Sequence, residues 1–243
     1  MNTVIDDFKK EFYRIREMGY VKAINNYNSG IGLTFENLLG KKVDDFPLPD
    51  FQNEIEIKTK LAFSTKPIHL FKLTPDGTEF FEMKRIVSKY GYYKMMSKVL
   101  SGSVFANKKT KIGRYYFSLF VNYKAEKVVL QIYNRNKVLI DNTSYWAFEK
   151  IETAMKRKLE YLAIVLVWPT QKNGTKYYKY YRYDIYKYTN IYTLLNLIDK
   201  GIISISFSIS TYSDEERYGK AHDHGTSFDI YMNDVKELFD RIT

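Results

Sequence analysis

Two acidic residues and one lysine in the first quarter of the chain have the types and spacing to bind a metal ion and assist hydrolysis of a phosphodiester bond. They are Asp50, Glu56 and Lys58. Carboxylate oxygens are the hard ligands that Mg²⁺ prefers, and a nearby lysine can orient or activate a water and neutralise charge on a phosphate. We therefore expect Asp50 and Glu56 to be metal ligands and Lys58 to act on the water and the phosphate.

The stretch that follows Asp50 is predicted to be a strand with one charged face. In it Ile55 and Ile57 alternate with Glu56 and Lys58. Successive side chains of a strand point to opposite faces, so Glu56 and Lys58 share one face while the isoleucines anchor the other in the core. Asp50 reaches the same metal ion from the start of the strand. Alone this pattern is weak, because alternating charges also occur on the solvated face of an ordinary edge strand.

The rest of the sequence predicts a mixed α/β protein without internal repeats. Apolar spacing and capping residues predict helices at residues 4–18, 34–39, 79–90, 145–159 and 191–199, and a last helix that begins near Asn233. Alternating or continuous apolar runs predict strands at residues 51–59, 68–74, 115–122, 127–133, 161–168, 176–185 and 202–210. Pro169 is expected to end the strand before it.

The composition of the chain limits which partners the protein is expected to bind and in which cellular compartment it is expected to work. The 243 residues include 38 Lys and Arg against 28 Asp and Glu, a formal charge of +10 that favours a polyanionic partner. There is no cysteine, which excludes disulfides and thiolate zinc sites. The first residues lack the apolar core of a signal peptide, and the longest apolar run, Tyr161–Trp168, is too short to cross a bilayer. We expect an intracellular protein.

Longer stretches around the charged strand occur in a recognisable order. They are Gly30–Gly40 (GIGLTFENLLG), Pro49–Phe51 (PDF), Glu56–Thr59 (EIKT), His69–Phe71 (HLF), Lys89–Tyr92 (KYGY) and His222–Phe228 (HDHGTSF). Together, from residue 28 to residue 231, they resemble the MvaI/BcnI family of type II restriction endonucleases, which are MutH-like members of the PD-(D/E)xK nuclease superfamily. An ordered set of motifs is far more specific than any one of them.

The resemblance implies a fold and an activity. The fold is the α/β, MutH-like restriction-endonuclease fold, in which a central mixed β-sheet is flanked by helices and two lobes form a DNA cleft. The activity is Mg²⁺-dependent hydrolysis of phosphodiester bonds in double-stranded DNA at a short, near-palindromic sequence, by a monomer that nicks one strand at a time. Mn²⁺ is expected to substitute for Mg²⁺.

The same resemblance implies a cellular setting and a division of the chain. We expect a restriction-modification system in the cytoplasm of a bacterial or archaeal cell, with a cognate DNA methyltransferase that forms no stable complex with this chain. Residues 1–243 are expected to form one endonuclease unit. Its catalytic lobe should comprise mainly residues 1–90 and 136–170, and its DNA-recognition lobe mainly residues 171–243.

Glu36 enters the expected active site through the resemblance. A carboxylate on a helix packed beside the strand could bind a second metal ion or position Lys58. The ordinary interpretation is a glutamate near a helix start, where the helix dipole favours negative charge.

The resemblance also places the histidine motif near DNA. We expect His222 and His224 to contact bases, because imidazole can donate a hydrogen bond to guanine N7 or O6. With the intervening Asp223 they do not suffice for a zinc site without further ligands. A surface loop of no special role is the alternative.

Residues expected to read DNA depart from the family pattern. Asp229 stands where relatives tend to carry arginine, and Ser206 and Ser208 stand where charged base readers are expected. Arginine reads guanine, whereas aspartate accepts from cytosine N4 and serine is permissive, so the recognised sequence should differ from the relatives' sites. Three lysines are predicted to contact the DNA backbone, although a solvated loop is the default interpretation: Lys108, Lys109 and Lys111.

Two other functions stay open on the sequence. A MutH-like mismatch-repair nicking endonuclease shares the chemistry but depends on accessory repair proteins. A non-catalytic, sequence-specific DNA-binding protein on the same fold is the other alternative, and the complete set of Asp50, Glu56 and Lys58 argues against it.

Overall fold

The computed structural model describes residues 2–41, 48–78, 81–212, 221–223 and 225–243. The chain forms two compact units. Unit 1 comprises Met1–Ile68, Met155–Tyr188 and Phe239–Thr243, and unit 2 comprises His69–Ala154 and Thr189–Leu238. The expected lobe boundaries differ from these, because residues 69–90 lie in unit 2 and residues 171–188 lie in unit 1.

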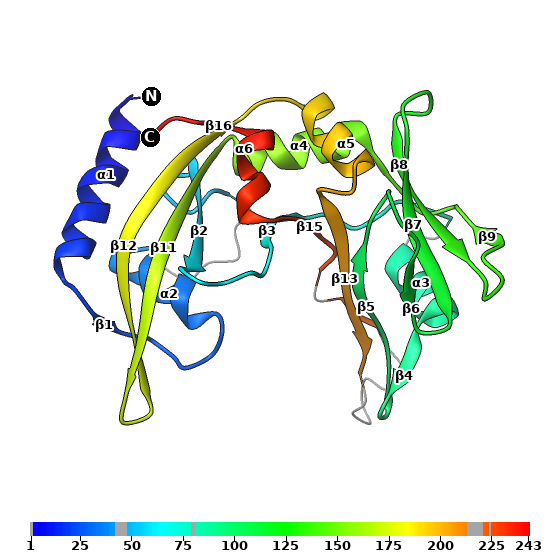
Figure 1. Cartoon of the computed structure of the whole chain (residues 1–243), viewed down its shortest axis with the longest axis horizontal. Coiled ribbons are helices and arrows are strands. Elements are labelled where there is room, and N and C mark those ends of the chain that lie inside the picture. The colour runs from blue at the N-terminus through cyan, green and yellow to red at the C-terminus, as the bar shows by residue number, and fades with distance from the viewer. Residues whose placement is uncertain (1, 42–47, 79–80, 213–220, 224) are drawn as a thin grey trace. The chain divides into compact units, whose positions relative to one another are not determined.

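Unit 1 is built on a mixed sheet (Figure 1). In sheet order its strands are β1 (Val21–Lys22), β12 (Thr175–Tyr188), β11 (Tyr161–Lys172) and β2 (Ile55–Leu61), with β16 (Phe239–Arg241) paired to β12. β2 runs parallel to β11, and the other pairs are antiparallel. The helices of this unit are α1 (Asn2–Glu17), α2 (Gly30–Leu38) and the end of α4 (Phe148–Leu159).

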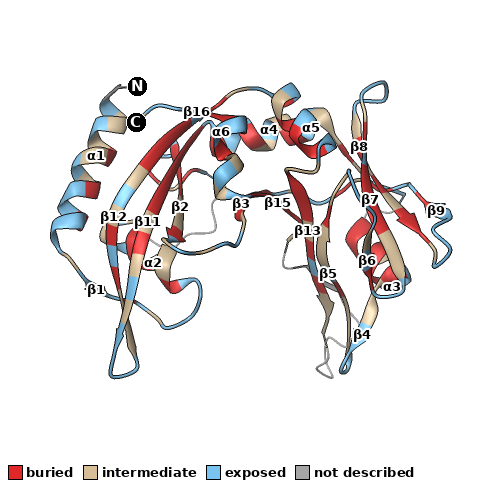
Figure 2. Ribbon diagram, viewed as in Figure 1, coloured by how far each residue is buried: buried red, intermediate tan, exposed pale blue. Residues whose placement is uncertain are grey.

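Helix α1 packs an aromatic face onto this sheet. Phe8, Phe12 and Ile15 recur at helical spacing and are fully buried, along one side of the helix (Figure 2). Phe8 contacts Phe51 edge to face, with the ring centroids 5.4 Å apart. Because Phe51 follows Asp50 in the chain, the core of unit 1 fixes the backbone beside a predicted metal ligand.

Helix α2 begins earlier than predicted. Gly30 starts it, and the expected cap Thr34 lies inside the helix, where its hydroxyl donates to the Gly30 carbonyl at 2.6 Å. A side chain at position 30 would collide with the backbone, because an added Cβ would lie 2.4 Å from the Asn25 carbonyl oxygen. This early start gives Glu36 a place well inside the helix.

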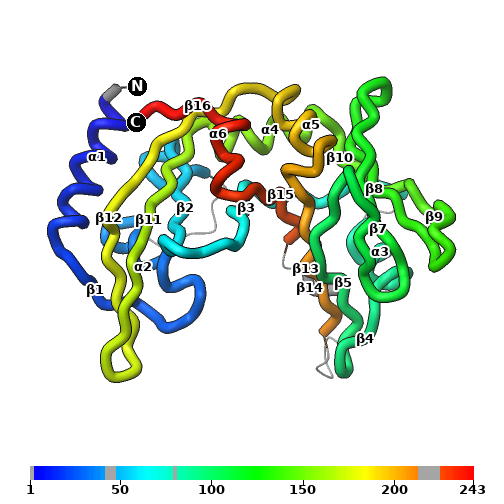
Figure 3. The backbone as a smooth tube through the Cα atoms, in the orientation of Figure 1, coloured from blue at the N-terminus to red at the C-terminus, as the bar shows by residue number. Residues whose placement is uncertain are grey.

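Unit 2 contains two sheets and the remaining helices. In sheet order the first has β3 (Ile68–Lys72), β15 (Ser227–Ile230), β13 (Ser204–Thr211), β5 (Ser97–Val104) and β4 (Tyr92–Lys94), with β14 (Ala221–Asp223) beside β13 (Figure 3). The second has β10 (Tyr145–Ala147), β8 (Lys127–Tyr133), β7 (Tyr115–Asn122) and β6 (Thr110–Ile112), with β9 (Leu139–Asp141) paired to β8. Its helices are α3 (Glu82–Tyr90), the start of α4, α5 (Ile191–Asp199) and α6 (Val235–Leu238), the last preceded by a 3₁₀ turn, Met232–Asp234.

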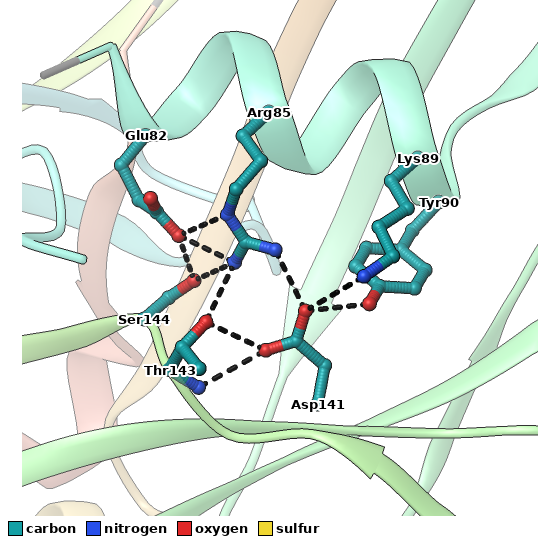
Figure 4. Close-up of polar contacts among 7 residues, drawn as sticks. All are labelled: Glu82, Arg85, Lys89, Tyr90, Asp141, Thr143 and Ser144. Atoms are coloured by element: carbon teal, nitrogen blue, oxygen red, sulfur yellow. Dashed lines mark hydrogen bonds and ion pairs between the residues drawn. The ribbon is translucent and has the colours of Figure 1, made fainter. Parts of the chain in front are cut away.

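A buried ion network anchors α3 in unit 2 (Figure 4). The Arg85 guanidinium donates to Asp141 Oδ2 and to Glu82 Oε1, each at 2.7 Å. Tyr90 also donates to Asp141. Burial acts to raise the pKa of Asp141, but the hydrogen bonds from Tyr90 and Arg85 outweigh it and hold this pKa well below its usual range. The network therefore holds α3 against the end of β9 through ion pairs that are largely shielded from water.

The structure confirms the mixed α/β architecture and corrects several element boundaries. The predicted helix at residues 145–159 begins only at Phe148, because Tyr145–Ala147 pairs with β8 as a strand. Strand β11 continues through Pro169 to Lys172. Proline is tolerated there because β2 pairs with β11 only as far as Val167, so no described strand on that side needs the backbone N–H that proline lacks. No helix in the described part of the chain has the length and apolar character that a bilayer span requires.

Candidate active site

Strand β2 brings Glu56 and Lys58 together. Lys58 Nζ donates to Glu56 Oε1 at 2.7 Å, as their shared face predicts. Glu56 is only 1% exposed although β2 lies at the edge of the sheet. Ile55 and Ile57 are buried in the core behind them. A carboxylate so fully buried is not part of a solvated strand face, so the ordinary explanation of the charge pattern does not hold for Glu56.

A tight turn before β2 holds Asp50 against the strand. Gln52 and Asn53 adopt left-handed backbone conformations, with φ of 49° and 59°, and strand β2 therefore starts at Ile55 rather than at Phe51. The turn carries Asp50 back, so that the Ile57 amide donates to Asp50 Oδ2 at 3.0 Å. Asp50 thus joins the end of the charged face, as the sequence predicted.

Two lysines that the sequence did not single out complete this cluster. Lys41, which follows α2, donates from Nζ to Asp50 Oδ1 at 2.6 Å. Lys158, in the last turn of α4, lies 3.5 Å from Glu56 Oε1. Their distance along the chain from Asp50 and Glu56 leaves no local pattern by which the sequence could have marked them.

Glu36 faces β2 from α2. A Cβ added to Gly32 would lie 3.5 Å from both Glu36 Oε1 and Thr59 Oγ1, which places the Glu36 carboxylate beside the strand. Burial and the negative charge of Asp50 raise the pKa of Glu36 above its ordinary value, against the opposing effect of the lysines. The structure therefore brings all four predicted catalytic residues into one region of unit 1.

The burial and the hydrogen bonding of Glu56 suit a ligand of a cation. Burial raises the pKa of Glu56 even though Lys58 lowers it. Its Oε2 atom is buried and has no hydrogen-bond partner among the described residues. A hard divalent cation would satisfy that oxygen.

The number of ligands suits Mg²⁺ better than a cation that needs a complete protein cage. Among the described residues no group of three or more His, Asp or Glu side chains is arranged to hold a metal ion. Mg²⁺ usually keeps several waters and takes one or two carboxylates plus substrate phosphate oxygens. The pair of Asp50 and Glu56 fits this pattern.

The predicted DNA-reading serines lie on one sheet face of unit 2. Ser206 of β13 is opposite Ser103 of β5, and their hydroxyl oxygens are 2.7 Å apart. The next pair on that face is Ser208 and Ser101, both exposed. This row offers hydroxyl groups that both donate and accept hydrogen bonds.

Asp229 does not present its carboxylate to solvent. The side chain is 1% exposed, and Oδ1 lies 2.6 Å from Nδ1 of His69, whose own side chain is 68% exposed. The carboxylate orients an exposed imidazole, and contact of Asp229 with DNA stays a prediction. The HLF motif marked His69 in the sequence, but no role was predicted for it.

The histidine motif is described only in part. The backbone pairing of the two strands places His222 of β14 opposite Ser210 of β13. The prediction for His224 lies outside the described residues.

The predicted backbone-contacting lysines are all exposed in unit 2. Lys108 Nζ lies 4.0 Å from the centre of the Phe105 ring, and Lys109 Nζ lies 3.8 Å from the centre of the Tyr133 ring. Lys111 extends from β6. Their ammonium groups are accessible to a polyanion.

Comparisons with known proteins agree with these features. The model of the MvaI/BcnI restriction endonuclease family matches residues 9–239. Among solved structures, a restriction endonuclease MvaI–cognate DNA substrate complex is similar at 28% identity and a TM-score of 0.90, over 100% of this chain and 98% of that chain. Restriction endonuclease MvaI in the absence of DNA is similar at 29% identity and a TM-score of 0.65, with the same coverage. A comparison with curated proteins gave no match.

Proposed function

The chain belongs to the MvaI/BcnI restriction endonuclease family and is a site-specific deoxyribonuclease, and on that premise we propose that Asp50, Glu56 and Lys58 form its Mg²⁺-dependent catalytic centre. The observation that carries this proposal is the assembly of the three residues: Lys58 lies 2.7 Å from Glu56, and Asp50 is hydrogen-bonded to the strand between them. The substrate is double-stranded DNA, cut at a short, near-palindromic sequence.

Asp50 and Glu56 are the residues that would hold the metal ion. Support comes from the buried Oε2 atom of Glu56, which lacks a hydrogen-bond partner among the described residues. A bound Mg²⁺, or Mn²⁺ in its place, activates a water and neutralises phosphate charge.

Lys58 and Glu36 act around these ligands. Lys58 is partly exposed, with 26% of its side chain accessible, so its ammonium can reach a phosphate while Glu56 orients it. Glu36 adds a carboxylate beside Lys58 that can position its ammonium group. Positioned charges of this kind stabilise the developing charge of phosphoryl transfer.

DNA recognition is assigned to unit 2. The described residues assigned to it are Ser206, Ser208, His222 and the His69 imidazole held by Asp229, and the role of His224 rests on the sequence alone. Lys108, Lys109 and Lys111 are assigned to the phosphate backbone, which positions DNA without reading its sequence. Asp229 in place of the relatives' arginine, and serine hydroxyls in place of charged readers, imply a recognised sequence different from the relatives' sites.

We assign one catalytic centre to each chain. The described residues contain one set of Asp50, Glu56 and Lys58, so a monomer hydrolyses one strand per engagement and cuts a duplex in two successive nicks. Such an enzyme works in the cytoplasm of a bacterium or archaeon, where a methyltransferase of the same restriction-modification system protects host DNA without a stable complex.

Plasmid digestion with end mapping tests this proposal. Purified protein with Mg²⁺ alone should convert supercoiled plasmid first to the nicked and then to the linear form, with every end mapping to one short sequence. Nicking that stops without accessory repair proteins would favour the MutH-like mismatch-repair function. Specific binding without any cleavage would favour a non-catalytic DNA-binding protein.

A further inference from the structure

Lys41 occupies the one carboxylate oxygen of Asp50 that strand β2 does not use. Asp50 Oδ2 accepts the Ile57 amide at 3.0 Å, and Asp50 Oδ1 accepts Lys41 Nζ at 2.6 Å. Both side chains are largely shielded, with 20% of Lys41 and 13% of Asp50 exposed. A cation approaching Asp50 must therefore meet an oxygen that already binds an ammonium group.

The described residues of the cluster already include ammonium groups beside each carboxylate. Among them, three carboxylates face three ammonium groups: Glu36, Asp50 and Glu56 against Lys41, Lys58 and Lys158. A divalent cation added beside these ammonium groups brings two more positive charges into a poorly solvated site. Repulsion between like charges at contact distance is strong there, which favours the departure of one ammonium.

The hydrogen bonds indicate which lysine departs. Glu56 can accept a cation at Oε2, which has no hydrogen-bond partner among the described residues, while Lys58 stays on Oε1. Asp50 Oδ2 is held by the Ile57 amide as part of the turn, so Oδ1 is the oxygen on which a metal ion and Lys41 compete. Exchange at Oδ1 leaves the backbone hydrogen bond in place.

We propose that Lys41 is the resident cation of the metal site: it neutralises Asp50 in the metal-free enzyme and leaves Asp50 Oδ1 when a divalent cation binds. This inference rests on the proposed role of Asp50 and Glu56 as metal ligands. Lys41 thereby sets the metal concentration that the enzyme needs, because every metal ion bound must first displace its ammonium. A variant with a neutral residue at position 41 should therefore bind the metal ion more tightly than the wild type.

Titration of the metal-free protein with Mn²⁺ tests the inference without DNA or catalysis. Free Mn²⁺ is measured by its electron paramagnetic resonance signal. Lys41→Met should bind Mn²⁺ about tenfold more tightly than the wild type, since both the competitor and its repulsion are removed. Lys41→Gln, also neutral, should show the same gain, and Lys41→Arg, which keeps the charge, should show none.

The matched control is a second lysine of the same pocket. Lys10 of α1 lines, with Lys41 and Asp50, a pocket of about 480 Å³, but its ammonium lies 3.7 Å from Asp7 instead of Asp50. Lys10→Met removes the same charge and should leave Mn²⁺ affinity unchanged. If Lys10→Met gained as much Mn²⁺ affinity as Lys41→Met, the gain would come from the loss of any nearby positive charge, and the inference would be overturned.

A further variant separates this inference from the proposed metal site. Asp50→Asn should lose Mn²⁺ binding. If it does, and both neutral variants of Lys41 bind Mn²⁺ no more tightly than the wild type, the exchange is refuted while the metal site stands. If Asp50→Asn binds Mn²⁺ like the wild type, Asp50 is not a ligand and both the metal site and the exchange are refuted.

Discussion

The backbone amide of Ile57 donates a hydrogen bond to the carboxylate of Asp50 across 3.0 Å. This bond joins the start of the charged segment to the strand that carries Glu56 and Lys58. It requires the chain to reverse direction between the two residues, which it does through the left-handed residues Gln52 and Asn53. The geometry of the catalytic centre therefore depends on a strained turn as well as on strand alternation.

Valine in place of Gln52 tests that dependence. A branched side chain tolerates the left-handed conformation poorly, so Gln52→Val should reduce the free energy of unfolding by about 1–2 kcal/mol. Urea unfolding measures the loss. The control is Gln171→Val, because Gln171 is exposed in strand β11, where valine is favoured. Equal stability of both variants would show that the turn is not strained.

Glutamine in place of Glu56 should separate stability from activity. Cleavage should fall at least about 100-fold, because a charged ligand is lost. Without metal, the variant should unfold at a higher temperature than the wild type at neutral pH, because burial raises the pKa of Glu56 and so penalises its ionised form. Calorimetry in chelator measures this, and Glu54→Gln, at an exposed position, should change neither property.

The stability difference should also depend on pH. A carboxyl with a raised pKa in the folded state binds its proton more tightly when folded, so the wild type gains stability as pH falls through that raised pKa. Glu56→Gln cannot gain it, and the gap between the two proteins should shrink on acidification. A gap that widens toward low pH would contradict the burial effect.

Strand alternation predicted the pairing of Glu56 with Lys58 because both residues lie on one short segment. Lys41 and Lys158 escaped prediction because they reach the cluster from the ends of α2 and α4. The sequence predicts Asp229 as a DNA-binding residue, and no local pattern reveals that its carboxylate is buried against His69, which lies far away in the chain. Local patterns thus give the segments and their faces, while contacts between distant segments decide which charges meet.

Methionine in place of Arg85 should destabilise the fold by roughly 3–5 kcal/mol, because it removes the buried guanidinium that pairs with both Glu82 and Asp141. Urea unfolding measures the effect. Arg182→Met is the control, because Arg182 is about half exposed and its partner Asp184 keeps Arg241; it should cost less than about 1 kcal/mol. Similar costs for the two variants would contradict the importance of the buried network.

Alanine in place of Lys109 or Lys111 should weaken DNA binding and reduce its dependence on salt. Each lysine that neutralises a phosphate contributes about one unit to the slope of log affinity against log salt concentration. Fluorescence anisotropy at several salt concentrations measures that slope. Lys236→Ala, at an exposed position of α6, serves as the comparison. Slopes equal to that of the wild type would remove these lysines from the DNA-binding surface.

The most direct measurement of the catalytic assignment is the cleavage rate of Asp50→Ala on supercoiled plasmid in Mg²⁺. Asp50 is the residue that the turn, the Ile57 amide and Lys41 together hold at the end of the charged strand. With the metal ligand removed, the rate should fall at least about 100-fold while the protein stays folded and binds DNA. Cleavage at the wild-type rate would show that the centre formed by Asp50, Glu56 and Lys58 does not perform the reaction.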